Sequence, residues 1–432
     1  MKKGIMFMVM ASLVIGLLGS AWARELSVWS VSAWINDETM EAYIEAFEKA
    51  HPDVKVSWRG LPVKTNMETL QMAGALALKN PKKHKFPDVF LTGPDMRMRT
   101  FIAAELIIGL NELFAKAAID PSLYPGTVFG VVEVEGVYYG LPLAPEVRGV
   151  VNINKDVFAD AGVPLPDNET SWDELVEMQR KLVVRNAKGE VTRYGSLSKY
   201  PVLDLVYAAG APILDNPLKP TKVLFGEDAF VDVIREFLEL ADEGVMMPLR
   251  VYKALGGSKP KIFGEEKVAT MITNCNYKGQ FEDMPFDWDV IVLPSPTGGQ
   301  AKRVHGSSFC WSIYTNTKDR DLAFEWARWV VFSVEALEAK ESLRKFNKDE
   351  VPYVREVRER LLEIAAGRKP DNWSCLVDLY SRMEPYIGSF QGSDKFSKLF
   401  WEASWDVLYE RAPIEKLREF ALKAQKVIDA LN

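Results

Sequence analysis

The stretch ELSVWSVSAWINDETMEAYIEAFEKAHPDVKVSW, residues 25–58, decides the fold. Its first residues alternate apolar and polar side chains, which is typical of a β-strand. A helix is expected next, because apolar side chains recur at helical spacing after a possible cap at Asn36 or Asp37. Pro52 ends this helix, and residues 54–58 alternate again as a second strand. This strand–helix–strand order predicts a mostly parallel sheet with helices on its faces.

The same alternation of strands and helices continues through the chain. Ser171 and Glu174 have the spacing of a capping box, which predicts the start of a further helix. The sequence contains no internal repeat and no low-complexity linker. Two α/β regions without a linker indicate that the chain crosses between them more than once. Further strands are expected at residues 87–92, 149–154, 268–273, 288–293 and 308–314, and further helices at 67–79, 171–182, 230–241, 324–331 and from 417 onward.

Residues 1–23 have the pattern of a cleavable bacterial signal peptide. Lys2 and Lys3 supply a positive start, and the uncharged apolar run at residues 5–18 follows. This run is shorter than the roughly 20 residues that a membrane-spanning helix needs. Ala21 and Ala23 place small side chains where signal peptidase requires them, so cleavage is expected after Ala23.

The position of the first cysteine indicates whether the exported chain can carry a lipid anchor. A bacterial lipoprotein carries a cysteine directly after its cleavage site, whereas the first cysteine here is Cys275. No later segment is apolar enough to span a membrane. We therefore expect a soluble mature protein that is not lipid-anchored and is located in the periplasm.

Composition limits the classes of function. The formal charge is −7, and loss of two lysines with the signal peptide would make it −9, which argues against nucleic acid or an anionic membrane surface as partner. The length favours two or more domains. The three histidines lack metal-ligand spacing, so no metal site is expected. Three cysteines permit one disulfide, and the sequence does not say which pair of Cys275, Cys310 and Cys375, if any, is joined.

Motifs for catalysis are missing. The chain has no glycine-rich phosphate loop, no Cys-x-x-Cys pair and no His-Glu-x-x-His sequence. The segment Gly306-Ser307-Ser308 lacks the second glycine of a nucleophile elbow. Carboxylates are plentiful, but a glycosidase pair cannot be chosen from sequence, because any two could converge. We expect no enzyme activity and no cofactor.

Short segments in a fixed order carry a family resemblance over nearly the whole mature chain. They are VWS (28–30), FEKAHPDV (47–54), PDV (87–89), ELIIGL (105–110), GVYYGLP (136–142), NKDVF (154–158), AGV (161–163), SWDEL (171–175), GEEKVATM (264–271), LP (293–294) and GSS (306–308). In this order the chain resembles the carbohydrate-type extracellular solute-binding proteins of bacterial ABC importers, the maltose-binding-protein-like family. Two positions depart from the family pattern: Ile153 replaces a frequent aromatic residue, and Asn276-Tyr277 stands where many members have a tryptophan.

The resemblance implies an α/β, two-lobed periplasmic binding protein fold of type II-like topology, with a multi-strand hinge and a ligand cleft between the lobes. It places residues 24–142 and about 297–335 in the N-terminal lobe, and residues 143–296 and about 336–432 in the C-terminal lobe. The implied function is capture of a sugar or oligosaccharide by hinge closure and delivery to a membrane permease. A monomer is expected.

Ligand-binding residues are expected in the loops at strand ends that face the hinge. Aromatic rings can cover the flat faces of a sugar, while carboxylates, arginines and amides bind its hydroxyls. Trp172, Trp311, Trp326 and Trp329 are expected in the core instead. The expected ligand-binding residues are Trp34, Asp95, Arg97, Glu146, Arg148, Asn276, Tyr277, Tyr386 and Phe390.

Two other functions stay open. The first keeps the binding role but changes the ligand to a polyamine, a phosphorylated polyol or a ferric ion. Tyr138 and Tyr139 are adjacent, as a ferric site could use, but neighbouring residues of a strand point to opposite faces. The second is a secreted glycosidase, which would release product continuously, whereas a binding protein would bind its ligand stoichiometrically without turnover.

Overall fold

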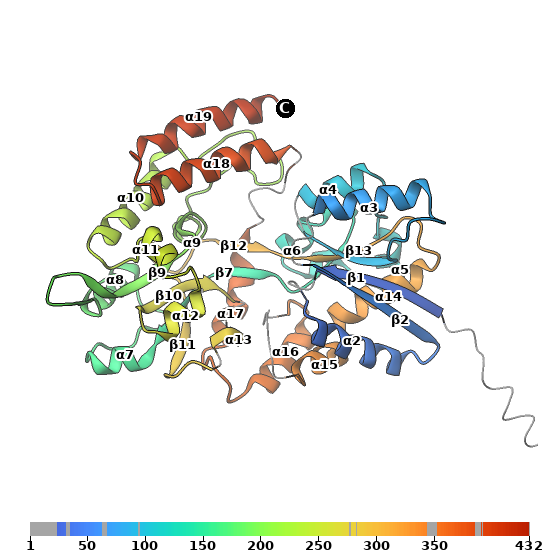
Figure 1. Cartoon of the computed structure of the whole chain (residues 1–432), viewed down its shortest axis with the longest axis horizontal. Helices are drawn as coiled ribbons and strands as arrows, with labels where there is room; N and C mark the ends of the chain where they lie inside the picture. Colours follow the sequence, from blue (N-terminus) through green and yellow to red (C-terminus); the bar gives the residue numbers. More distant parts are fainter. Residues whose placement is uncertain are drawn as a thin grey trace, which may run out of the picture.

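The computed structural model describes residues 24–31, 35–62, 67–93, 96–275, 278–281, 283–343, 352–384, 390 and 392–431. The expected signal peptide, residues 1–23, lies outside the described residues. The chain forms two lobes, each built on its own sheet with helices packed against it (Figure 1). In the described part of the chain, no helix has the length and apolar character needed to cross a membrane.

The first lobe contains a five-stranded mixed sheet. Its strands lie in the order β2 (Val54–Leu61), β1 (Arg24–Val31), β3 (Val89–Thr92), β13 (Cys310–Ile313) and β6 (Leu141–Pro142). β1 pairs in parallel with β2 and β3, whereas β13 is antiparallel to β3 and β6. Helices α3 (Met67–Lys79) and α4 (Met96–Ala103) lie on one side of this sheet, and α2 (Asp37–Ala50), α14 (Arg320–Phe332) and α15 (Val334–Glu341) lie on the other (Figure 1). The remaining elements of this region are the two-stranded pair β4–β5, helices α5 and α6 and one 3₁₀-helix.

The helices and minor strands of the first lobe have the following bounds: α2 (Asp37–Ala50), α3 (Met67–Lys79), α4 (Met96–Ala103), α5 (Asn111–Lys116), η1 (Pro121–Leu123), α6 (Gly126–Gly130), β4 (Glu133–Val134), β5 (Val137–Tyr138), α14 (Arg320–Phe332) and α15 (Val334–Glu341).

The second lobe is built on a sheet with β7 near its middle. The strands run in the order β14 (Met383–Glu384), β12 (Val304–Ser307), β7 (Glu146–Asn154), β10 (Val268–Asn274), β9 (Val191–Ser198) and β8 (Val184–Arg185), and β11 (Trp288–Val292) also pairs with β7. β9 and β10 are parallel, whereas β7 is antiparallel to β10, β11 and β12. The helices that follow β6 in the second lobe and in the C-terminal region are α7 (Lys155–Asp160), α8 (Trp172–Lys181), α9 (Pro201–Ala208), α10 (Asp228–Asp242), α11 (Leu249–Ala254), α12 (Lys259–Gly264), α13 (Lys278–Phe281), α16 (Arg355–Ala365), α17 (Ser374–Asp378), η3 (Leu379–Arg382), α18 (Ser393–Leu408) and α19 (Glu415–Asp429).

The chain passes between the two sheets at two described places. It leaves the first sheet after β6, runs through residues 143–145 and enters the second sheet as β7. It returns between β12, which pairs with β7, and β13, which pairs with β3. Helix α15 then packs against α2 of the first lobe. The division of the whole chain into lobes at the boundaries given above stays a prediction.

Local sequence signals account for where several helices begin. The Asn36 side chain accepts a hydrogen bond from the Thr39 amide at 2.8 Å and caps α2, as predicted. The capping box predicted at Ser171 and Glu174 is also present at the start of α8. Trp172, which follows the cap, is buried and donates a hydrogen bond from its indole N–H to the Glu236 carboxylate.

We expect Ser171→Ala to lower the free energy of unfolding by about 1 kcal/mol, because it removes an N-cap and half of a capping box. Urea unfolding of both proteins measures the difference. A matched control is Ser381→Ala, since the Ser381 hydroxyl is exposed and donates to a backbone carbonyl, that of Asp378. Equal losses of unfolding free energy in the two variants would show that the capping box does not stabilise the protein more than an ordinary surface hydrogen bond.

The predicted core tryptophans are confirmed. Trp311 and Trp326 are fully buried, and Trp329 is 6% exposed. The three cysteines, Cys275, Cys310 and Cys375, are all buried, and none of them is part of a disulfide.

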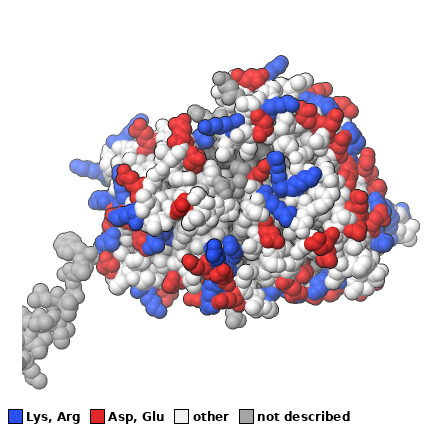
Figure 2. Space-filling view, turned by 180° about the vertical axis from the view of Figure 1, so that it is seen from behind, with Lys and Arg blue, Asp and Glu red and all other residues white. Residues whose placement is uncertain are grey.

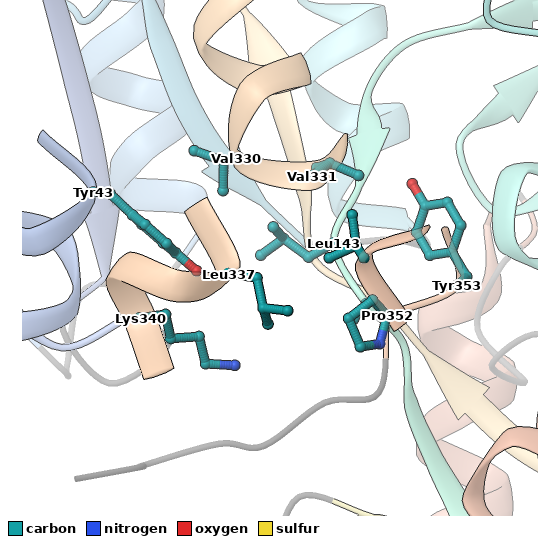
Figure 3. Close-up of a pocket in the computed structure, with 10 residues that line it drawn as sticks. Tyr43, Leu143, Val330, Val331, Leu337, Lys340, Pro352 and Tyr353 are labelled. Atoms are coloured by element: carbon teal, nitrogen blue, oxygen red, sulfur yellow. The ribbon is translucent and has the colours of Figure 1, made fainter. Parts of the chain in front are cut away.

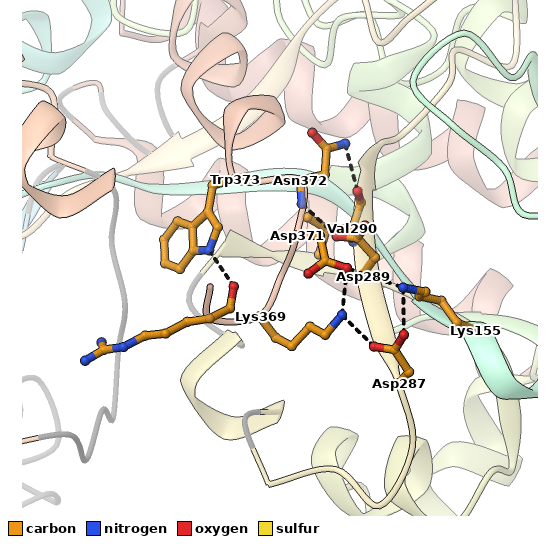
Figure 4. A network of polar contacts seen from close by, with 9 residues as sticks. Lys155, Asp287, Asp289, Val290, Lys369, Asp371, Asn372 and Trp373 are labelled. Carbon is orange, nitrogen blue, oxygen red and sulfur yellow. Dashed lines mark hydrogen bonds and ion pairs between the residues drawn. The ribbon is translucent and has the colours of Figure 1, made fainter. Parts of the chain in front are cut away.

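A network of alternating charges fastens the segment after α16 to the second lobe (Figure 4). The Lys369 ammonium lies 2.6 Å from both Asp287 and Asp371, and the Lys155 ammonium lies 2.7 Å from Asp287. The Asn372 backbone amide donates to the carboxylate of Asp289 in β11 at 2.9 Å. Because these groups are partly exposed, their role is to fix the position of the segment rather than to add much stability.

Candidate functional site

The second sheet gathers polar residues at the edge where the chain enters it. β9 and β10 run in parallel with Ser198 opposite Ile272, so their carboxyl ends lie side by side. β7 runs the other way, with Arg148 opposite Asn274, so its first residues lie at the same edge. Ligands of open α/β sheets bind outside the carboxyl ends of the strands. This edge is therefore the candidate wall of a cleft in the second lobe.

The first sheet presents an equivalent edge. β3 ends at Thr92, which lies opposite Cys310, the first residue of β13 after the return crossing. The predicted residues Trp34 and Asp95 follow the ends of β1 and β3, but both lie outside the described residues. Arg97 lies in α4, where only its backbone is described.

Glu146 and Arg148, both predicted to bind ligand, begin β7. The half-buried Glu146 carboxylate accepts a hydrogen bond from the Asn274 side-chain amide. Arg148 is only 5% exposed, and its ion-pair partner is Asp204 of α9 rather than Glu146. Nε of Arg148 donates to one Asp204 oxygen at 2.6 Å and Nη2 donates to the other at 3.0 Å. This is a buried, two-bond guanidinium–carboxylate pair.

Asp204 is held from a second side as well. The Ser198 hydroxyl at the end of β9 donates to Asp204 Oδ2 at 2.6 Å. Burial acts to lower the pKa of Arg148, but the Asp204 carboxylate outweighs it, so the pKa of Arg148 stands above its ordinary value. Arg148 therefore stays protonated inside the lobe, and its pair with Asp204 locks β7, β9 and α9 together at the candidate cleft wall.

Further positive charge lies beside this pair. The Arg148 guanidinium lies 5.1 Å from the centre of the Tyr200 ring, and the Lys199 ammonium lies 4.8 Å from the same ring. Lys259, the first residue of α12, is 3% exposed. Burial and the Arg148 charge lower the pKa of Lys259 to about 7, although Asp204 opposes them. This side of the second lobe therefore carries a concentration of cationic side chains in an acidic protein.

One pocket is lined by elements on both sides of the lobe boundary and encloses about 970 Å³, including its open mouth. Arg99 and the β4–β5 turn line it from the first lobe. Burial lowers the pKa of Arg99, while Glu135 and Glu133 act in the opposite direction. Leu218, Lys219, Pro220, Phe390 and Leu431 line it from the other side.

Phe390 is the predicted ligand-binding residue that this pocket includes. Its side chain is 3% exposed, and its ring packs against Phe396 of α18 with centroids 5.6 Å apart. Of the other aromatic and amide candidates, Asn276, Tyr277 and Tyr386 lie outside the described residues. Ligand contact by all nine predicted residues stays a prediction.

A second pocket, of about 500 Å³ including its mouth, lies against the first crossing (Figure 3). Leu143 of the crossing, Val331 of α14 and Leu337 of α15 line it with apolar side chains, and Lys340 lies at one side. The buried Tyr353 hydroxyl donates to the Pro142 carbonyl at 2.8 Å. This pocket is therefore part of the hinge, where three segments distant in sequence meet.

On the face shown in Figure 2, acidic and basic side chains are interspersed over both lobes.

Among the described residues, no group of three or more histidine, cysteine, aspartate or glutamate side chains is placed to hold a metal ion.

Sequence reasoning missed several residues of the candidate wall. Asp204, Lys259 and Tyr200 were not among the predicted site residues. The signal that could have found two of them is Ser198-Lys199-Tyr200-Pro201, where a strand ends and proline starts a helix. Asp204 follows in the first turn of that helix, at the edge where ligands bind in such sheets.

Comparisons with known proteins identify the family. The family model of the bacterial extracellular solute-binding proteins matches residues 33–333. No curated protein matches the chain in sequence.

Solved structures share the fold over nearly the whole chain. An ABC substrate-binding protein from Listeria monocytogenes in complex with cycloalternan is 20% identical, with a TM-score of 0.74, covering 94% of this chain and 99% of that chain. The sugar-binding protein MalE from Xanthomonas citri is 16% identical, with a TM-score of 0.73 and coverage of 94% and 98%. UgpB from Mycobacterium tuberculosis, in complex with glycerophosphocholine, is 14% identical, with a TM-score of 0.72 and coverage of 96% and 100%.

The predicted α/β, two-lobed periplasmic binding protein fold is thus confirmed, and the chain belongs to the bacterial extracellular solute-binding protein family.

Proposed function

We propose that this protein is the periplasmic substrate-binding component of an ABC importer, that it captures a sugar or oligosaccharide by hinge closure, and that it delivers this ligand to a membrane permease. The observation that carries the proposal is the meeting of two sheet edges at the crossings between the lobes. A ligand placed there can touch both lobes only when they close, and such differential contact is what drives closure.

The chemistry of the candidate wall supports a polyhydroxylated ligand. Glu146, Asn274 and Lys199 provide acceptors and donors for hydroxyl groups, and the Tyr200 ring provides an apolar face. The proposal retains all nine predicted ligand-binding residues, includes no chemical step, and assigns no cofactor. It also retains a monomeric protein that is not lipid-anchored.

A sugar is favoured over the other solutes because two similar structures are described as bound to cycloalternan or as sugar-binding. The phosphorylated-polyol alternative keeps some support, since another protein of the same fold was solved with glycerophosphocholine. Polyamines are disfavoured by the Lys199 ammonium, which lies over the Tyr200 ring at the candidate wall.

The test is a melting-temperature screen of the mature protein against neutral, acidic and phosphorylated saccharides, polyamines and glycerophosphodiesters. A ligand that binds only the folded state at a hundred times its dissociation constant should add about 2.7 kcal/mol of stability. We expect a saccharide to give the largest increase, with one-to-one stoichiometry and no product in the same solution. Failure of every saccharide, or sustained release of product from one, would contradict the proposal.

A further inference from the structure

An aromatic pocket of about 990 Å³, including its mouth, opens on the second lobe beside the candidate wall. Tyr200, at the start of α9, belongs both to this pocket and to the buried cluster around Arg148. Tyr252 of α11 forms another part of the pocket, and Trp405 and Tyr409 at the end of α18 complete it. Four aromatic side chains from three separate helical regions thus converge on one space.

Trp405 is the feature that a structural role does not explain. Trp405 is 42% exposed, whereas every other tryptophan in the described part of the chain is buried or half-buried. It stands nearly perpendicular to Tyr409, with ring centroids 6.0 Å apart. A partly exposed indole beside a phenol ring offers an aromatic surface on which a sugar ring can pack, because sugars have flat C–H faces.

Two lysines give this pocket a charge preference. The Lys199 ammonium lies 4.8 Å from the Tyr200 ring centre and 5.9 Å from that of Tyr252. The Lys253 ammonium lies 4.9 Å from the Tyr409 ring centre. Both ammonium groups are therefore held over the rings, where an anion on a stacked ligand can reach them. Glu410 also lines the pocket and supplies an acceptor for ligand hydroxyls.

The balance of charges in the pocket supports this preference. Arg148 lies against the Tyr200 ring but is paired with Asp204, so the pocket's own charge comes from Lys199 and Lys253, opposed by Glu410. An anionic substituent would be attracted by this net positive charge. The local charge is opposite in sign to the net charge of the protein, −7.

We infer that this pocket, which we call the Trp405 pocket, is a subsite for an anionic sugar unit, carboxylated or phosphorylated, that stacks on Trp405 and pairs with Lys253 and Lys199. The inference rests on the proposed function and gives it a substrate class: acidic saccharides.

Helix α18 runs from the pocket at the lobe boundary to the Trp405 pocket. Phe390 lines the pocket at that boundary just before α18 begins, and Trp405 lies twelve residues beyond Ser393, about 18 Å along the helix. A ligand that reaches both pockets has to be an oligomer.

The experiment is calorimetric titration of the mature protein with trigalacturonate, with glucose 6-phosphate and with neutral maltotriose. The variants are Trp405→Ala, Trp405→Phe and Lys253→Met. The matched control is Lys423→Met, because Lys423 also lies over a ring, that of Phe420 at 4.2 Å, but on α19 outside the pocket. Melting curves without ligand establish that each variant is folded.

We expect at least one of the two anionic probes to bind more tightly than maltotriose. Trp405→Ala should weaken that binding about tenfold or more, while Trp405→Phe retains most of it. Lys253→Met should weaken anion binding about tenfold and leave the neutral sugar unchanged. Lys423→Met should change neither affinity. If the anionic probe that binds is trigalacturonate, the ligand is carboxylated; if it is glucose 6-phosphate, the ligand is phosphorylated.

Tighter binding of maltotriose than of both anions would overturn the inference and leave the proposed function intact. Equal affinities of Lys253→Met and Lys423→Met for the anion would also overturn it. If no saccharide binds, here or in the melting-temperature screen, both the inference and the proposed function fail.

Discussion

Asp204→Asn should lower the free energy of unfolding by about 3–5 kcal/mol, the largest effect that we expect from any single substitution in this protein. The side chains of Arg148 and Asp204 are 6% and 0% exposed. Loss of the carboxylate charge leaves a buried guanidinium without its counter-ion and weakens the hydrogen bond from Ser198. A cost of this size is a large fraction of the stability of an ordinary domain.

The matched control is Asp228→Asn, which makes the same chemical change in an exposed pair. The side chains of Arg418 and Asp228 are 46% and 81% exposed, so solvent screens this pair and the control should lose far less stability than Asp204→Asn. The double variant Arg148→Met/Asp204→Leu should be more stable than Asp204→Asn alone, since it removes both charges and keeps the space filled. Urea unfolding measures all three proteins. Similar losses for Asp204→Asn and Asp228→Asn would contradict the buried pair.

The second large effect is on the pH dependence of stability. The pKa of Lys259 is lowered to about 7 in the folded protein from an ordinary value of 10.5. Between these two pH values the unfolded chain binds one more proton than the folded chain, so this group makes stability rise with pH. The slope is up to about 1.4 kcal/mol per pH unit for one proton. Below pH 7 both states are protonated, and the cost of the buried charge is fully present.

Lys259→Met should therefore raise the free energy of unfolding at pH 7 by a few kcal/mol and remove this slope. The measurement is urea unfolding of both proteins at several pH values from 6 to 9.5. Comparing the two proteins separates the effect of Lys259 from that of groups that make stability fall as the pH rises. Cys375 is such a group, because burial raises its pKa. Lys261→Met is the control, since Lys261 is 60% exposed. Parallel curves for wild type and Lys259→Met would contradict a buried, destabilised ammonium.

Local patterns in the sequence predict much of the fold. The helix at α3 begins and ends at the predicted residues, Met67 and Lys79, and the capping residues of α2 and α8 act as predicted. These signals work because they are complete within a few residues of chain. The family resemblance then supplies the two-lobed arrangement, which periodicity alone could not give.

Residues far apart in the sequence determine the rest. β9, β12 and α9 were not predicted, and β9 and α9 bring Ser198 and Asp204 to the edge of the second sheet. Arg148 was predicted as a ligand contact from its place after the first crossing. Its pairing with Asp204, 56 residues later, depends on β7 and β9 flanking β10, and no local pattern reports that. The exposure of Trp405 likewise depends on how α18 lies beside α9 and α11, which share two pockets with it.

The central claim is that the two lobes close around a bound saccharide. Small-angle X-ray scattering of the mature protein, without ligand and with the saccharide that gives the largest increase in melting temperature, tests it most directly. The account predicts a smaller radius of gyration at saturation, one ligand per chain and an unmodified saccharide afterwards. An unchanged radius of gyration at proven saturation, or a hydrolysed saccharide, would contradict it.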